Sequence, residues 1–476
     1  MLNDFFNIFL PQGCLIFFII LQLILGLILS PRFYKYARII SATAVSLSAV
    51  LLSTVQVEPQ YFGFRNAVMS DNYTLLFHFV ILLCGFFVIL LTKNLVSNTK
   101  KNAYIFHSVL LTAIFGAMNI VSANDFLTLF ISVELLAFPI YFLISSSKGY
   151  FPKEAAFKYL ITSAVSTGVF LFGVSYLYGL TTSVDFSTIY EIMSEREPSL
   201  LYTFSSVMIV LGLISKLSVF PFANWIIDVF KGCETSILAF LSTIPKIAMF
   251  GILCRLLVFP LSMSFELSFV IAILAIITAL WANTYAIREN NVKVILACSS
   301  AANASYVLLV ASLVSVYNLS TVIFYLICYV LMNLSVFAFL NITQANGIGI
   351  ITNDFSGLFH KNHTLSAAYI IAIIGLAGFP ITSGFVAKIY LFSAIANSGL
   401  IFIPFLLVLL ILMVVALFYY LKLILPMFEG VSVDTKILSA AYSQKFVLII
   451  TAIVTVLIGV YPEKLIELCR FIAYNI

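Results

Sequence analysis

The sequence predicts an all-helical protein that crosses a membrane about fourteen times. The first observation is composition: 63% of the 476 residues are hydrophobic and only 9% are charged, with a mean hydropathy of +1.15. A soluble domain carries about 25% charged residues. A chain this poor in charge cannot cover itself with a water-facing surface, so lipid must be its solvent. The second observation is the length of the apolar runs, and the third is the distribution of charge between them.

The apolar runs define the predicted spans, because a transmembrane helix needs about 20 mostly apolar residues. The first run follows no basic segment and no small-residue cleavage site, so we expect a retained helix. The seventh and twelfth runs contain Pro221 and Pro380 well inside them, and the twelfth is too long for one straight crossing. We therefore expect both to be broken helices. The fourteen spans are 13–30, 38–56, 73–92, 104–121, 125–146, 155–180, 201–226, 236–258, 266–287, 293–314, 317–340, 365–398, 401–425 and 443–461.

Basic residues between the spans predict the orientation, since cytoplasmic and matrix loops carry an excess of Lys and Arg. Loops after odd-numbered spans hold fifteen of them and the opposite loops hold five. Both termini are therefore expected on the periplasmic or intermembrane side of an inner membrane, as is an acidic loop at Asp185–Glu197. The fifteen are Arg32, Lys35, Arg38, Lys93, Lys100, Lys101, Lys148, Lys153, Lys231, Arg288, Lys293, Lys361, Lys422, Lys436 and Lys445, and the five are Arg65, Arg196, Arg255, Lys464 and Arg470.

Five charged residues are assigned to the interior of the predicted spans, namely Glu134, Lys158, Lys216, Lys246 and Lys388, whereas charges at the span ends, such as Arg255 and Lys293, are counted with the adjoining loops. An ionisable group at the bilayer centre costs about 3 kcal/mol or more, normally faces a protein interior or wet cavity, and marks an ion pathway. Lys246 is near the middle of its span, where its side chain reaches neither headgroup layer. Lys158 is near the basic end of its span, so snorkelling to the interface explains it as well as a functional role does. For the other four, the alternative is a buried structural ion pair.

Lysine is suited to proton transport. Removal from water favours its neutral form, whereas a nearby carboxylate favours its charged form. A lysine whose carboxylate partner can approach and withdraw therefore loads and releases a proton. Glu134 and Lys216 form the natural pair of this kind, which is a hypothesis about their separation.

The two prolines lie in similar segments, FPFANW at 220 and FPITSG at 379. Two broken helices at corresponding places in two halves are typical of an inverted-repeat transporter whose site lies at the breaks. Spans four to eight and nine to thirteen would be the two repeats.

Other kinds of site are disfavoured. The seven cysteines are scattered without a CxxC pair, which argues against zinc, iron–sulfur ligation and disulfides. His360 and His363 share a loop without further ligands, and His78 and His107 are too isolated to hold a haem. No phosphate loop or nucleotide fingerprint occurs. We expect no cofactor, metal or redox centre in this chain and no nucleic-acid partner, so a partner or an ion gradient must supply the energy.

Five segments together resemble the antiporter-like subunits of respiratory complex I. Their order and spacing match that family across nearly the whole chain. The resemblance implies fourteen helices, with two inverted five-helix repeats and with helices seven and twelve broken. It also implies four segments, 1–103, 104–258, 266–427 and 428–476. The matching sequences are AAFKYLITSAVSTGVFLFGVSYLYGLT (155–181), GLISKLSVFPFANWIIDVFKG (212–232), AFLSTIPKIAMFG (239–251), VKVILACSS (292–300) and GLAGFPITSGFVAKIYLF (375–392).

Three subunits of complex I share this fold, as do large subunits of Mrp-type sodium/proton antiporters. The segment ALFYYLKLILPMF (416–428) resembles the branch called subunit N in bacteria and subunit 2 in mitochondria. Lys388 stands where the middle subunit usually has a glutamate. The chain ends soon after span fourteen, without the long lateral helix of the largest subunit. The expectation is therefore the subunit N branch.

The resemblance also implies roles, position by position. Glu134 is similar to the helix-five glutamate that modulates the helix-seven lysine, here Lys216. Lys246 matches the central helix-eight lysine, and Lys388 matches the helix-twelve lysine near the outlet. Lys158 matches a recurrent helix-six lysine.

Two positions depart from the family pattern. Asn303 in SSAANASY stands where a histidine is usual, and Ala223 in PFANW stands where a histidine is common. Asparagine can hydrogen-bond but takes up no proton at physiological pH. The link between Lys246 and Lys388 would then run through water, with Tyr306, Ser299 or Ser300 as lining.

The function implied is that of a translocase subunit without a redox centre. It would move protons through the buried charges while quinone reduction elsewhere in NADH:quinone oxidoreductase drives them. The parent complex would carry FMN and iron–sulfur clusters and use NADH and a quinone. Partners would be other membrane-arm subunits, including a second antiporter-like subunit and small helical subunits, and lipids. One alternative is a gradient-driven Mrp-type antiporter subunit. Another is a structural membrane-arm subunit with a decayed channel, which Asn303 motivates.

Overall fold

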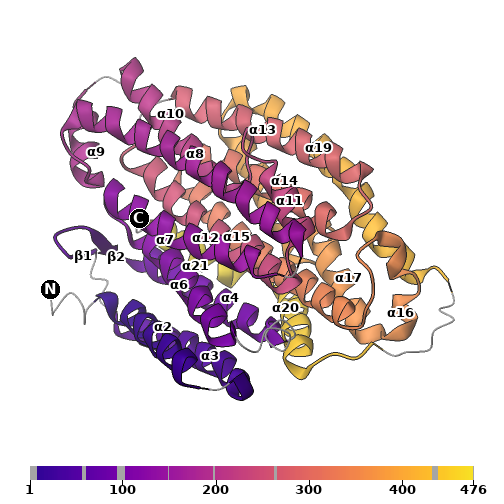
Figure 1. Ribbon diagram of the computed structural model, residues 1–476. Helices are drawn as coiled ribbons and strands as arrows, with labels where there is room; N and C mark the ends of the chain where they lie inside the picture. Colours follow the sequence, from indigo (N-terminus) through magenta and orange to yellow (C-terminus); the bar gives the residue numbers. More distant parts are fainter. Residues whose placement is uncertain are drawn as a thin grey trace.

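The computed structural model describes residues 8–29, 31–55, 60–93, 102–147, 149–196, 199–261, 265–430 and 438–474. Within these ranges, thirteen helices are long and apolar enough to cross a membrane, and they form one bundle (Figure 1). The remaining predicted crossing is the twelfth, which is divided into α17 (His363–Ala377) and α18 (Ser383–Asn397). The all-helical membrane fold is therefore confirmed. The thirteen are α2 (Leu10–Ile28), α3 (Tyr34–Leu51), α4 (Asn72–Leu91), α6 (Ala103–Ser122), α7 (Phe126–Ser145), α8 (Tyr150–Thr181), α10 (Leu200–Ile214), α12 (Thr235–Val258), α13 (Phe265–Arg288), α14 (Val292–Ser312), α15 (Val316–Ala345), α19 (Ile403–Ile424) and α20 (Tyr442–Val460).

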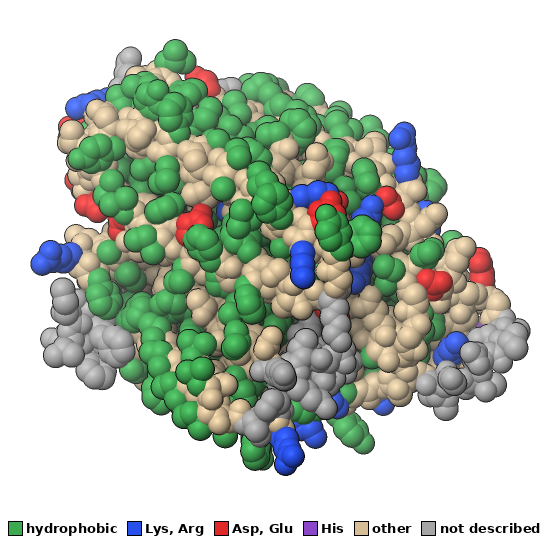
Figure 2. Space-filling view, in the orientation of Figure 1, with side chains coloured by type: hydrophobic (Ala, Val, Ile, Leu, Met, Phe, Trp, Pro, Cys, Tyr) green, Lys and Arg blue, Asp and Glu red, His purple; other side chains and the backbone are tan. Residues whose placement is uncertain are grey.

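Three helices lie at the centre of the bundle. The spanning windows of α12 and α14 are entirely buried, and that of α15 is 94% buried. Outer helices such as α2 and α19 are only 22% buried, and the face of the molecule in Figure 2 is mostly hydrophobic, with few charged side chains. The central helices can carry polar side chains because neighbouring helices, unlike lipid, supply hydrogen-bond partners.

Both predicted helix breaks are present. After α10, a 3₁₀ turn covers Ser215–Leu217, and no further helix begins until α11 (Trp225–Gly232). The second break lies between α17 and α18. Pro221 and Pro380 fall in these breaks, whereas Pro139 and Pro245 lie inside α7 and α12, which remain continuous. A proline alone therefore does not break a helix in this bundle.

The two halves of the chain share one backbone pairing. An isolated antiparallel bridge joins Asp125 to Asp185, and another joins Asn291 to Ile351. Each bridge spans sixty residues (125 to 185, 291 to 351), and each is flanked by backbone hydrogen bonds of 2.8–3.1 Å. In both halves it ties the start of the second helix of the expected repeat to the connection before its broken helix. This match supports two five-helix repeats, whereas the four segment boundaries 1–103, 104–258, 266–427 and 428–476 stay a prediction.

Several short elements were not predicted. Strands β1 (Tyr61–Gly63) and β2 (Val68–Ser70) form an antiparallel hairpin before α4. The predicted acidic loop contains α9 (Phe186–Ser194), so the loop prediction was wrong there; Glu197 lies outside the described residues. This helix buries apolar residues at helical spacing but is too short for a 20-residue template. The other elements are α16 (Leu358–Lys361), α21 (Glu463–Tyr474) and 3₁₀ turns at Pro31–Phe33, Leu52–Thr54, Thr352–Phe355, Leu400–Phe402 and Leu425–Phe428.

Two basic residues assigned to water-facing loops are instead buried within the protein. Arg255 lies inside α12 and Lys293 in the first turn of α14, and both are buried. Each is near the end of its span, where sequence does not tell a water-facing side chain from a protein-facing one. Each has a partner: Arg255 pairs with Asp71, and Lys293 donates to the Cys233 carbonyl at 2.7 Å. Four other members of the loop set, Lys100, Lys101, Lys148 and Lys436, lie outside the described residues.

Candidate functional site

Lys216 lies in the 3₁₀ turn where α10 ends, at the first helix break. Its side chain is buried, and Nζ donates a hydrogen bond to Ser163 Oγ on α8. The ring of Tyr159 faces the ammonium, with Nζ 5.9 Å from the ring centroid. Trp225 packs on Tyr159 and donates from Nε1 to the Ser215 carbonyl at 3.1 Å. The ammonium is thus enclosed by a hydroxyl and an aromatic face.

Glu134 lies on α7 and is half-buried. Its Oε1 accepts a hydrogen bond of 2.7 Å from Thr167 Oγ1 on α8. In the described part of the chain no ion pair within 4.0 Å joins Glu134 to Lys216. The α8 hydroxyls of Ser163 and Thr167 instead hold the two groups.

Lys158 is placed apart from the buried charges. Its side chain is 45% exposed and lies 2.9 Å from Glu154 on the same helix and 3.2 Å from Asp228 on α11. These ion pairs tie α8 to the second half of the first broken helix. The sequence allowed either a side chain that reaches the membrane interface or a functional role for Lys158, and this exposed position favours the first.

Lys246 lies in the middle of α12 and is 3% exposed. Its Nζ donates to the Ser300 carbonyl at 2.6 Å and to Ser300 Oγ at 2.5 Å, both on α14. Ser300 Oγ in turn lies 2.8 Å from Tyr329 OH. A cavity of about 10 Å³ opens beside Lys246 and reaches Asn303 and Tyr325, which is room for a single water molecule.

Asn303 occupies the centre of the polar cluster next to that cavity. Its Oδ1 accepts from Tyr325 OH at 2.6 Å, and its Nδ2 donates to the Ser299 carbonyl at 2.8 Å and to Tyr420 OH at 3.3 Å. Ser299 Oγ and Tyr420 OH are 2.5 Å apart. The cluster therefore extends from the cavity beside Lys246 to Tyr420 on α19. Tyr306, the other expected lining residue, is 3.5 Å from Asn283 Nδ2 on α13.

Lys388 lies on α18, just after the second break, and is buried. Its Nζ donates to the carbonyls of Leu376 at 2.7 Å and Ala377 at 2.9 Å, at the end of α17. The last carbonyls of a helix are unpaired and carry negative partial charge, which suits an ammonium. Gly378 follows with φ +87, and a Cβ there would lie 2.7 Å from Lys388 Cδ. Glycine is thus required for this approach.

The sequence did not predict a buried ion pair between Arg255, on the same helix as Lys246, and Asp71. Arg255 Nη2 is 2.7 Å from Asp71 Oδ2, and both side chains are at most 1% exposed. Asp71 also caps α4 by accepting from Thr74 N at 2.7 Å. The Arg255 guanidinium lies 5.1 Å from the centroid of the Tyr73 ring. The only sequence signal was Asp71 in an N-cap position directly before an apolar run.

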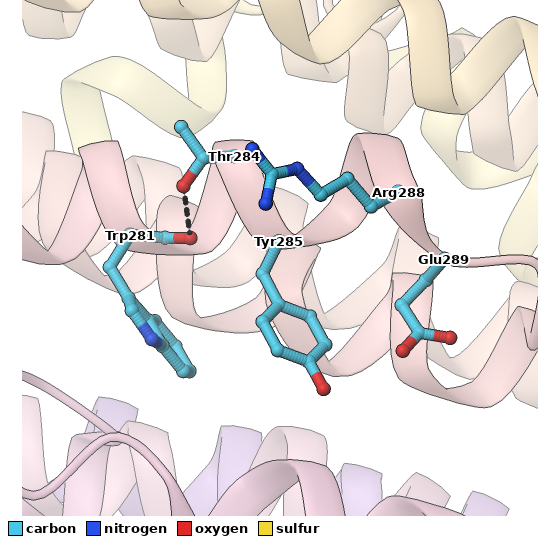
Figure 3. Close-up of a pocket in the computed structure, with 5 residues that line it drawn as sticks. All are labelled: Trp281, Thr284, Tyr285, Arg288 and Glu289. Carbon is cyan, nitrogen blue, oxygen red and sulfur yellow. Dashed lines mark hydrogen bonds between the residues drawn. The ribbon is translucent and has the colours of Figure 1, made fainter.

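A groove of about 520 Å³ lies on α13, outside the lysine sites. Figure 3 shows its lining residues along this one helix, with Thr284 donating to the Trp281 carbonyl at 3.0 Å. The groove is lined by Trp281, Thr284, Tyr285, Arg288 and Glu289, and it contains none of the candidate residues.

The two histidines of the HxxH segment do not form a metal site with other described residues. The rings of His360 and His363 are 6.4 Å apart, and the described residues hold no group of three potential metal ligands.

Residues 123–414 match the family model described as "NADH:quinone oxidoreductase/Mrp antiporter, TM". The match covers more than half of the chain, including both helix breaks and all five charged candidates. The chain belongs to this family.

Individual proteins similar to this chain come from the same antiporter-like family. NADH-quinone oxidoreductase subunit N of Desulfitobacterium hafniense is 31% identical over 429 residues, which cover 85% of each chain. A chain in respiratory complex I from Thermus thermophilus superposes with a TM-score of 0.82 at 25% identity, over 96% of this chain and 98% of that one. A chain of the Mrp complex from Dietzia sp. DQ12-45-1b gives 0.82 at 19% identity, over 98% and 97%, and so shares the fold. The resemblance to antiporter-like subunits is confirmed.

Proposed function

We propose that this antiporter-like protein is the subunit N translocase of NADH:quinone oxidoreductase and that protons pass through Glu134, Lys216, Lys246 and Lys388. The observation that carries the proposal is the contrast with Arg255. That cation is fixed by a buried carboxylate, whereas Lys216, Lys246 and Lys388 hydrogen-bond only to hydroxyls and carbonyls in the described ranges, as does the buried Lys293 at the start of α14. A lysine held by neutral groups can release its proton, but an ion pair holds the cation in its charged form.

The route between Lys246 and Lys388 would pass the Asn303 cluster. Asparagine cannot carry the proton itself, but Tyr325, Tyr420 and Ser299 surround it with hydroxyls, and the adjoining cavity admits water. Tyr306 would lie at the edge of this route. Lys388 would release the proton at the second break, where α17 ends.

The energy for transport would come from outside the chain. We infer a parent complex that carries FMN and iron–sulfur clusters, oxidises NADH and reduces a quinone, with no redox centre contributed by this subunit. Its neighbours would be other membrane-arm subunits, including a second antiporter-like subunit and small helical subunits, with lipid around them. Both termini would face the periplasmic or intermembrane side.

The second candidate function is that of an Mrp-type sodium/proton antiporter subunit. The family description names both machines, and the Dietzia chain shares the fold. The third candidate, a structural subunit with a decayed channel, has weaker support. Asn303 is fully integrated into a hydrogen-bonded cluster, and Lys216, Lys246 and Lys388 are present and buried.

Purification after gentle detergent extraction from the native membrane tests the proposal. We expect the chain to co-migrate with NADH–quinone oxidoreductase activity and with iron–sulfur subunits. Co-migration with small membrane subunits alone, without redox activity, would instead assign it to an antiporter assembly.

Substituting Lys158 with methionine should leave proton pumping within about twofold of wild type, because exposed ion pairs contribute little. NADH-driven acidification of inverted membrane vesicles measures this, with Lys216→Met as the comparison. If Lys158→Met pumped as poorly as Lys216→Met, Lys158 would have to be added to the proton route.

A further inference from the structure

We propose that Thr167 and Ser163 of α8 are positioning residues that hold Glu134 and Lys216 apart as a hydroxyl-separated pair. The inference rests on the proposed function and deepens it. Glu134 Oε1 accepts from Thr167 Oγ1 at 2.7 Å, and Lys216 Nζ donates to Ser163 Oγ. The two charged groups thus contact the same helix without contacting each other.

The spacing of the two hydroxyls sets the offset of the two charges. Residues 163 and 167 are four apart, so they lie on one face of α8 about 6 Å apart along its axis. α8 packs against both α7, which carries Glu134, and α10, which leads to Lys216. A hydroxyl suits both tasks, since it donates to a carboxylate and accepts from an ammonium.

Other hydroxyls on α8 show that these contacts are specific. Thr162 is half-buried like Thr167, and its Oγ1 bonds the Lys158 carbonyl one turn earlier at 2.7 Å. Thr167 Oγ1 lies 3.0 Å from the equivalent carbonyl, that of Ser163, but is nearer to Glu134 Oε1, at 2.7 Å, so the carboxylate competes for its single hydroxyl proton. Thr162 is therefore a control that differs in the one contact under test.

The arrangement positions charges and does not itself conduct. The connection from Thr167 to Ser163 runs through a backbone carbonyl, which has no proton to pass on. What the hydroxyls prevent is collapse into a direct ion pair. In a buried site such a pair would hold Lys216 in its charged form. Held one helical turn apart, the carboxylate still attracts the ammonium, but Lys216 remains free to give up its proton.

The test uses the assembled complex in inverted membrane vesicles and measures protons pumped per NADH oxidised, normalised to assembled subunit. We expect Thr167→Val to lower pumping about tenfold, because hydrogen bonds to charged groups are the strong ones. Thr167→Ser, which keeps the hydroxyl, should restore it, and Thr162→Val should leave it unchanged. In a Glu134→Gln background, Thr167→Val should have no further effect, since Thr167 acts through that carboxylate.

Two results would overturn the positioning role: normal pumping by Thr167→Val, or an equal loss in the Glu134→Gln background. Ser163→Ala gives a second variant should Thr167→Val assemble poorly, and it is expected to impair pumping in the same way. The variant Lys246→Met distinguishes failure of the positioning role from failure of the proposed function. If it abolishes pumping while Thr167→Val does not, only the positioning role is wrong. If Lys246→Met pumps normally, the proposed function fails.

Discussion

Proton pumping is expected to fall below about a tenth of wild type when Lys246 is replaced by methionine, since a positioned proton carrier contributes about a hundredfold or more to transfer. Lys246 is a buried lysine in the middle of α12, beside the cavity that also reaches Asn303. Methionine fills a similar volume in α12 but cannot accept a proton. The readout is acidification of inverted vesicles during NADH oxidation.

Lys246→Arg is the informative companion to that variant. Arginine keeps the positive charge but is not deprotonated in proteins, so it should fail as a carrier too. NADH oxidation with an artificial electron acceptor confirms that the complex has assembled. A normal ratio of protons to NADH in either variant would remove Lys246 from the route.

The second large effect is expected on stability. Asp71→Asn leaves Arg255 buried without a counter-charge, and breaking a buried ion pair in this way costs about 3–5 kcal/mol. Asparagine still caps α4, so the loss is electrostatic. We expect little subunit in the membrane, or a marked fall in the detergent-solubilised thermal midpoint, as measured by the temperature at which the protein aggregates.

Two controls distinguish the loss of the Asp71–Arg255 charge pair from a general disruption of the folded protein. The double variant Asp71→Asn with Arg255→Met removes both charges and should recover much of the stability, because a buried ion pair can often be replaced by neutral groups without loss. Asp228→Asn breaks an exposed ion pair, and its effect on the thermal midpoint should be small. If Asp71→Asn were as stable as Asp228→Asn, the buried pair would carry no stabilising role.

The crossings and the helix breaks were predictable because apolar length and proline leave a signal in consecutive residues. Even so, proline was a partial guide, since Pro139 and Pro245 sit in continuous helices. Both breaks also contain residues with positive φ, such as Ser218 and Gly378. A break therefore depends on several local residues, of which the proline is the most visible.

The candidate site was predictable in its members but not in its contacts. Burial of Lys216, Lys246 and Lys388 followed from their distance to the span ends. Arg255 and Lys158 both lie nearer to the end of a span, yet Arg255 is buried and Lys158 is exposed. This difference depends on which helices pack against each residue. The same holds for Glu134 and Lys216. The sequence predicts that these two charges interact, but the hydroxyls that contact them come from α8, and only the packing of the helices brings them there.

The complete enclosure of α12 has a consequence for biogenesis. In the finished bundle this helix is surrounded by protein, yet newly inserted helices reach a bilayer before they associate. At that stage Lys246 and Arg255 must be carried by the helix alone, and a central lysine opposes insertion by about 3 kcal/mol. The spanning part of α12 is apolar enough to cross a membrane, although protein covers it completely in the finished bundle. Its leucines and isoleucines thus serve delivery into the membrane as well as packing, so polar substitutions on α12 are expected to reduce yield before they reduce transport.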